Sequence, residues 1–154
     1  MAKKTHQDLY RDVPKNPRKK LSISLPMPPS VNHMYINLKS GGKILTKKAE
    51  QYVRESRALI NLAIDEQRWT KDRDHVWYYA DLVFFMPDRR IRDSHNTLKL
   101  LMDVMNGIVF KDDYYCMPRI QGVEYDNINP RVEVRMSKQN KGDRDYAKNI
   151  ADKY

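Results

Sequence analysis

Apolar and polar residues follow two different periodicities along this chain. "LSISL" at residues 21–25 alternates at every second position, which is typical of a half-buried strand. From Lys47 to about Gln67 the apolar residues recur every three or four positions, so this stretch predicts an amphipathic helix with Thr46 as its N-cap. The expected buried face of this helix comprises Ala49, Val53, Ile60 and Ile64, with Leu59 and Ala63 beside them.

The segment between these two elements predicts a loop followed by a hairpin. Three prolines interrupt regular structure in "PMPPSVNHMY" at residues 26–35. The next stretch, "INLKSGGKILT" at residues 36–46, predicts two short strands around the turn Ser40-Gly41-Gly42. Further on, "HVWYYADLVFFM" at residues 75–86 is rich in aromatic and β-branched residues and predicts a central strand that ends at Pro87.

A second helix is predicted from Ser94 or His95 to about Met105, with Gly107 ending it. Its expected buried stripe comprises Leu98, Leu101, Met102 and Met105. Two further strands are predicted at residues 116–125 and 131–136, joined by the turn "DNINP". Strands before and after two main helices predict a single small α+β domain with a mixed or antiparallel sheet.

The chain is predicted to have three parts. Residues 1–19 are polar and basic and predict a flexible arm, and residues 20–136 form the folded domain. Residues 137–154 form a polar tail of mixed charge, either frayed or folded as a short peripheral helix.

The composition indicates which kind of partner the chain binds and in which compartment it works. With 154 residues and a formal net charge of +9, the chain suits one basic domain, which favours polyanions such as nucleic acid or an anionic membrane surface. It has no apolar run of about 18 residues and no apolar signal segment at its start, so we expect no membrane partner. A single cysteine, Cys116, excludes an internal disulfide and fits the reducing cytoplasm.

The candidate chemistry lies in "MPDRRIRDSHNTLKLLMDVMNGIVFKDD", residues 86–113, which combines clustered arginines with spaced aspartates. Taken one at a time, these aspartates are ordinary helix caps and turn residues. Taken together, they suggest phosphodiester hydrolysis, which needs carboxylates for a divalent cation and basic groups for the phosphates. A nuclease therefore explains why both residue types are close together.

Two stretches resemble the RusA family of Holliday-junction resolvases, small dimeric endonucleases of bacteriophages and prophages. "LPMPPSVNHMY" at residues 25–35 is similar to the family's leading strand and proline-proline-serine loop, with Asn32 matching its downstream asparagine. Residues 86–113 are similar to the family's proline-aspartate-arginine run, acidic pair, asparagine, lysine and distal aspartates. The resemblance covers roughly residues 20–136 and implies a RusA-like fold and a homodimer.

The resemblance also implies an activity and a set of site residues. The activity is metal-dependent cutting of four-way DNA junctions by paired symmetric nicks, in phage or prophage recombination and repair. The implied catalytic residues are Asp93, Lys99 and Asp113. The implied ligands of magnesium, or of manganese, are Asp93, His95, Asp112 and Asp113. The implied DNA contacts are Asn32, Arg89, Arg90, Arg92 and Asn96.

His95 departs from the family, which usually has a second aspartate at this position. A neutral imidazole binds metals without adding negative charge, and it suits manganese or zinc better than magnesium. His95 is therefore a substituted ligand, a general base for the attacking water, or the mark of a weakened enzyme. Because Asp93, Asp112, Asp113 and Lys99 are all present, we favour a retained active site with an altered metal preference.

Two rival functions stay open at this point. A structure-specific DNA-binding protein that has lost catalysis would bind junctions and leave them uncut. A general basic adaptor would bind junction, duplex and single strand with similar affinity, whereas a resolvase prefers the junction. Outside the matched positions, His33 could contact DNA, and Lys43, Lys47 and Lys48 could bind phosphate, but we expect all four to be solvated surface residues.

Overall fold

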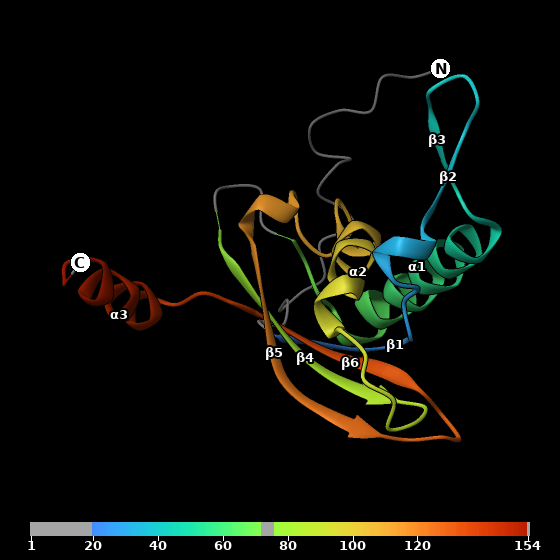
Figure 1. Ribbon diagram of the computed structural model, residues 1–154. Coiled ribbons are helices and arrows are strands. Elements are labelled where there is room, and N and C mark those ends of the chain that lie inside the picture. Colours follow the sequence, from blue (N-terminus) through green and yellow to red (C-terminus); the bar gives the residue numbers. More distant parts are fainter. Residues whose placement is uncertain (1–19, 72–75, 154) are drawn as a thin grey trace, which may run out of the picture.

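The computed structural model describes residues 20–71 and 76–153, and Figure 1 shows their arrangement. The predicted basic arm at residues 1–19 lies outside the described residues. In chain order the elements are β1 (Lys20–Pro26), η2 (Val31–His33), β2 (Tyr35–Asn37), β3 (Lys43–Leu45), α1 (Lys47–Gln67), β4 (Tyr78–Met86), η3 (Ser94–Thr97), α2 (Leu98–Met105), η4 (Asp113–Tyr115), β5 (Cys116–Tyr125), β6 (Arg131–Lys138) and α3 (Lys141–Ala151), where η marks a 3-10 turn.

The predicted mixed sheet has four strands in the order β1-β6-β4-β5. The pairs β1–β6 and β6–β4 are antiparallel, whereas β4 and β5 run parallel, starting from the pair Tyr78 and Cys116. They run parallel because the chain returns through α2 before it enters β5, as a parallel connection requires. The predicted hairpin is a separate pair of strands, β2 and β3, and Gly41 supplies the positive φ of +90° in its turn.

The hydrophobic core lies on one face of the four-stranded sheet. Along β4 every second side chain is buried, from Tyr78 through Leu82 and Phe84 to Met86, while the residues between them are half-buried on the opposite face. Helices α1 and α2 pack on the buried face, and Ile60 of α1 and Leu101 of α2 are completely buried in the same cluster. The loops at the ends of β1 and β4 are therefore held by a packed scaffold.

The helices differ in three details from the predicted pattern. A third helix, α3, follows the sheet, is closed by a capping box between Asn140 and Asp143, has no buried residue and extends away from the domain (Figure 1). In α1 Val53 and Ile64 are half-buried against the core, Tyr52 and Ser56 are fully buried beside them, and Leu59 is exposed. The predicted second helix begins with the 3-10 turn η3, and the buried face of α2 is wider than the predicted stripe.

The wider face includes residues outside the predicted stripe. Leu101, Met102 and Met105 are buried as predicted, Leu98 is half-buried against the core, and Leu100 and Val104 are buried as well. Among the described residues, no helix is both long and apolar enough to cross a membrane.

Trp69 links the end of α1 to the segment after α2 and makes a testable contribution to stability. Its indole Nε1 donates to the carbonyl of Val109 at 2.8 Å, and only 3% of the residue is exposed. We expect Trp69→Phe to lower the free energy of unfolding in a urea titration by about 1–3 kcal/mol, because the carbonyl is left buried without its donor. Trp77→Phe is the control, since it also removes one indole N–H from a less buried position. Equal losses in both variants would contradict this role.

Candidate active site

The two stretches singled out in the sequence meet at one cavity of about 450 Å³. Pro28 and Pro29, in the loop after β1, line one side. Asp93 and Asn96, in the segment after β4, line another, where η2 contacts η3. The cavity therefore joins residues separated by about sixty positions in the sequence, and it lies beside the predicted catalytic aspartate.

The proline-rich loop is tied to the first turn of α1. Ser30 Oγ lies 2.9 Å from His33 Nδ1, which fixes the imidazole within η2. The hydroxyl of Thr46 donates to the carbonyl of His33 at 2.9 Å and also accepts the N-capping bond from the Ala49 amide at 3.2 Å. Because Thr46 holds both the loop and the helix, Lys48 in the first turn of α1 reaches the cavity lining.

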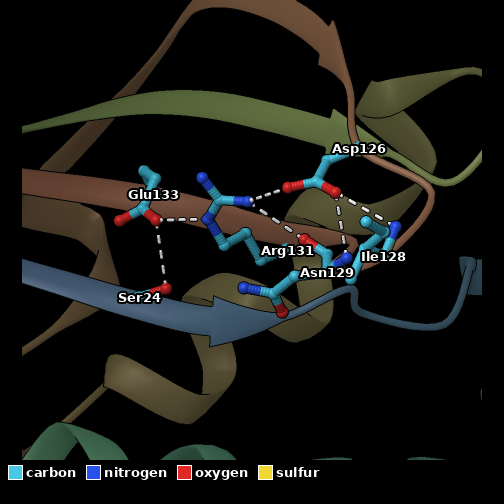
Figure 2. A network of polar contacts seen from close by, with 6 residues as sticks. All are labelled: Ser24, Asp126, Ile128, Asn129, Arg131 and Glu133. Carbon is cyan, nitrogen blue, oxygen red and sulfur yellow. Dashed lines mark hydrogen bonds and ion pairs between the residues drawn. The ribbon is translucent and has the colours of Figure 1, made fainter.

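The turn between β5 and β6 supplies a third wall through Pro130. Figure 2 shows how this turn is held: the Asp126 carboxylate accepts from the amides of Ile128 and Asn129 at 3.1 and 3.0 Å, and from Arg131 Nη1 at 2.8 Å. These bonds, that of the Asn129 amide first, hold the pKa of Asp126 below its usual range. The turn is therefore fastened by an ionised carboxylate.

The same network continues onto the sheet. Arg131 Nε donates to Glu133 at 2.6 Å, and Glu133 accepts from the Ser24 hydroxyl of β1 at 3.1 Å (Figure 2). At the other end of the turn, the Asp126 amide donates to the carbonyl of Met86, the last residue of β4, at 2.8 Å. The position of Pro130 is thus set from three strands.

The arginine cluster is partly committed to contacts within the protein. Arg92 forms a two-pronged ion pair with Asp88, with Nη2 at 2.9 Å from Oδ2, and the Arg90 amide donates to the same carboxylate. The guanidinium of Arg89 lies 4.9 Å from the centre of the Tyr125 ring, whereas the Arg90 side chain is 84% exposed. Arg90 is thus more accessible to a phosphate than Arg92, which is 35% exposed, although Arg90 Nε also lies 3.9 Å from Asp88 Oδ2.

The Asp88–Arg92 ion pair also persists over a defined pH range. Hydrogen bonding from Arg92, with help from the Arg90 amide, holds the pKa of Asp88 well below its usual range. A carboxylate with a lowered pKa stabilises the fold above the ordinary aspartate pKa and loses that contribution only as the pH falls through the lowered value. Arg92 therefore stays paired in neutral and mildly acidic solution.

We expect Asp88→Asn to release Arg92 for phosphate contact. Since one more cation then meets the DNA backbone, the slope of log Kobs against log salt concentration should steepen by roughly 0.9 in duplex binding. Fluorescence anisotropy of labelled duplex over a salt series measures this slope. Asp65→Asn, on the exposed side of α1, is the matched control for the loss of one negative charge. If the two variants show the same slope, Arg92 is not held back by Asp88.

Asp93 is the N-cap of η3, and its carboxylate contacts His95, two residues further along the chain. Its Oδ1 accepts from the His95 amide at 2.9 Å and lies 3.2 Å from His95 Nδ1. The Asp93 and His95 side chains are 56% and 76% exposed. The predicted N-cap role of Asp93 is confirmed, and the cap leaves the second carboxylate oxygen without a partner among the described residues.

The other predicted catalytic residues lie along α2 and beyond it. Lys99 Nζ is 3.6 Å from Asp103, one turn further along the same helix face. Asp112 caps η4 by accepting from the Tyr114 amide at 2.9 Å, and Asp113 is the first residue of that turn. Helix α2 contacts both η3 and η4. In the sequence it lies between the acidic residue Asp93 and the acidic pair Asp112 and Asp113.

Comparison with known proteins decides the family. The family model for the endodeoxyribonuclease RusA matches residues 26–137, which is well over half of the chain. The chain belongs to the RusA family. Members of this family are crossover junction endodeoxyribonucleases, nucleases of DNA recombination that resolve Holliday junctions. A search of curated proteins gave no match.

RusA nucleases are generally metal-dependent, so the side chains present must be tested against a cation. Within residues 20–71 and 76–153, no three His, Cys, Asp or Glu side chains gather as a metal cage. Magnesium needs no such cage, because it keeps several waters and uses one or two carboxylates together with substrate phosphates. The uncommitted oxygen of Asp93, exposed beside the cavity, fits that mode of binding.

The structure brings together some of the predicted site residues and leaves others apart. Asn32, Arg92, Asp93 and Asn96 line the cavity. The residues outside the lining are Arg89, Arg90, His95, Lys99, Asp112 and Asp113.

Two polar lining residues were weighed in the sequence but not assigned to the site. His33 and Lys48 are exposed, as expected, and both line the cavity. The signal for His33 was its position next to Asn32 in the family loop, and the signal for Lys48 was its place in a lysine run at the helix start. Neither signal could show that they meet, because the approach of Lys48 depends on the bond between Thr46 and the loop.

Proposed function

We propose that this RusA-family protein is a metal-dependent Holliday-junction resolvase, which cuts four-way DNA junctions by paired symmetric nicks in phage or prophage recombination and repair. The observation that carries the proposal is the cavity where the proline-proline-serine loop meets Asp93 and Asn96. Family membership supports the reaction class, and the lining of the cavity by Asn32, Arg92, Asp93 and Asn96 supports a site there.

The first proposed role is cation binding by carboxylates. Asp93 would bind magnesium through its uncommitted oxygen, with Asp113 and His95 as further ligands, whereas Asp112, which the family pattern also assigns, is committed to the cap of η4 and would contribute little. A bound cation polarises the scissile phosphate and lowers the pKa of a bound water. His95 holds Asp93 through its amide and lies against it through Nδ1, so it orients the carboxylate whichever metal is used.

The second proposed role is charge stabilisation by cations of the protein. Lys99 is 57% exposed, and its Nζ lies 3.6 Å from Asp103. An exposed ion pair of this kind is weak in water, so the ammonium can turn toward DNA. It would stabilise negative charge on the leaving oxygen. Arg89 and Arg90 would hold flanking phosphates, while Asn32 and Asn96 face the DNA from the cavity wall.

The third part of the proposal is a homodimer. A four-way junction is approximately two-fold symmetric, so a dimer with the same symmetry sets one active site on each of two opposed strands. The net charge of +9 supplies attraction to the arms through phosphate contacts, which carry affinity without sequence information.

The test is cleavage of a labelled four-way junction with magnesium and manganese added separately. We expect paired symmetric nicks, with manganese supporting faster cutting than magnesium because of His95. His95→Asp should move the preference back toward magnesium, and it serves as the matched variant. Tight binding without cutting in either metal would identify a DNA-binding protein that has lost catalysis and would overturn the proposed activity.

A further inference from the structure

We propose that the cavity beside Asp93 receives one unstacked nucleotide of the junction, with Asn32 and Asn96 binding its base edge and Lys48 its phosphate. This inference rests on the proposed function and deepens it, since it assigns a ligand to a specific cavity. It also gives the protein a physical reason to prefer branched DNA over duplex.

The size and walls of the cavity suit a planar, largely apolar group. Its volume of about 450 Å³ lies within the range of about 300–1,000 Å³ that is usual for small-molecule sites. Apolar side chains form much of the wall, and they are Met27, Pro28, Pro29, Met86, Pro87 and Pro130. Flipped bases are held between apolar or aromatic side chains in this way. Rigid proline rings offer flat surfaces that lose little side-chain entropy on contact.

The polar groups of the cavity are matched to a base edge. The side chains of Asn32 and Asn96 form no hydrogen bond with any residue that the structure describes. An amide carries both donors and an acceptor, and nucleobase edges present the complementary set. Asn96 is half-buried at the cavity wall, and its unpaired amide is available to a bound base.

Lys48 provides the charge that a phosphate requires. It lies in the first turn of α1, where a cation is disfavoured by the positive end of the helix dipole. Within the described residues it has no ion-pair partner, whereas Arg92 on the same lining is already paired with Asp88. Asp93 is the sole carboxylate of the lining, so the site proposed for the nucleotide adjoins the predicted catalytic aspartate.

A nucleotide enters such a cavity only after it leaves its stack. Unstacking costs least where pairing and stacking are already interrupted, as they are next to the crossover of a junction. Binding the unstacked nucleotide therefore favours branched DNA over continuous duplex with no reading of the surrounding sequence.

The experiment places 2-aminopurine at the nucleotide beside the crossover and follows its fluorescence in buffer without divalent cations, where the junction stays intact. No Trp, Tyr or Phe lines the cavity, so an unstacked 2-aminopurine bound there should stay bright. We expect a several-fold increase in fluorescence with the wild-type chain. The same probe placed well inside an arm should stay dim.

The variants separate the cavity from general DNA affinity. Lys48→Ala and Asn32→Ala should each abolish most of the fluorescence increase and reduce the preference for junction over duplex by roughly tenfold, as loss of a good base or phosphate contact does. Lys47→Ala is the matched control: it removes the same charge from the same helix turn, but Lys47 does not line the cavity. It should keep the full increase.

The outcomes distinguish this inference from the proposed function. If the wild-type chain binds and cuts junctions but the probe beside the crossover stays dim, the cavity proposal is wrong and the resolvase proposal stands. Equal behaviour of Lys48→Ala and Lys47→Ala would also overturn the cavity proposal. Free 2-aminopurine deoxynucleotide that saturates the cavity without DNA would show a nucleotide site unconnected with junctions, and it would contradict the inference too.

Discussion

Asp93→Asn is expected to slow junction cleavage on the order of 10³-fold or more, while fold and junction affinity stay close to wild type. Asparagine caps a helical turn about as well as aspartate does, so η3 should keep its start. What the variant loses is the negative charge that a divalent cation needs. An effect confined to the cutting rate would assign Asp93 to catalysis.

The measurement is single-turnover cleavage with saturating protein, because it separates the rate of cutting from binding. Asp65→Asn is the control, because it removes one exposed carboxylate from α1, at a position distant in sequence from Asp93. Circular dichroism of both variants checks the fold. If Asp93→Asn cuts as fast as wild type, Asp93 is only a cap and the site assignment fails.

Asp113→Asn is expected to abolish cutting to a similar extent, and Asp112→Asn to leave most of it. The two adjacent aspartates differ in their contacts within the protein. The Asp112 side chain accepts a hydrogen bond from the Tyr114 amide and so caps η4. Asparagine caps a helical turn equally well. Asp113 has no hydrogen bond or ion pair within the described residues, so its carboxylate is available to a cation.

The pair provides its own control because the two substitutions are chemically identical and one residue apart. Single-turnover cleavage should show a loss on the order of 10³-fold for Asp113→Asn and less than about tenfold for Asp112→Asn. The reverse order would move the distal ligand to Asp112. Equal losses would mean that η4 must keep both charges.

Local sequence signals predicted the elements well where one periodicity dominates. The bounds of α1 follow from Thr46 and the helical spacing after it, and the alternation in β1 and the aromatic and β-branched residues of β4 predicted strands that the sheet contains. Short-range chemistry was readable too, since the cap at Asp93 connects residues two positions apart. The end of the chain was left as two alternatives, and helix α3 is the one found.

Errors arose where packing decided between neighbouring positions. Tyr52 is buried on α1 in spite of its hydroxyl because its ring lies against the core, and burial raises the pKa of that hydroxyl. Leu98 is only half-buried, whereas Leu100 and Val104 are buried beyond the predicted stripe. Periodicity indicates the centre of a buried face, and tertiary packing sets its width.

The residue types needed for a nuclease, their order and the family likeness are present in the chain before it folds, because each depends on residues close in sequence. Folding decides which of them share a surface. Pro28, Asn96 and Pro130 meet at one cavity only because β1 and β4 flank β6 in the sheet and the network around Arg131 fixes the turn before that strand. Lys48 joins them through Thr46, and Arg92 is held by Asp88. Such contacts depend on distances between segments far apart in the chain, and tertiary packing alone sets those distances.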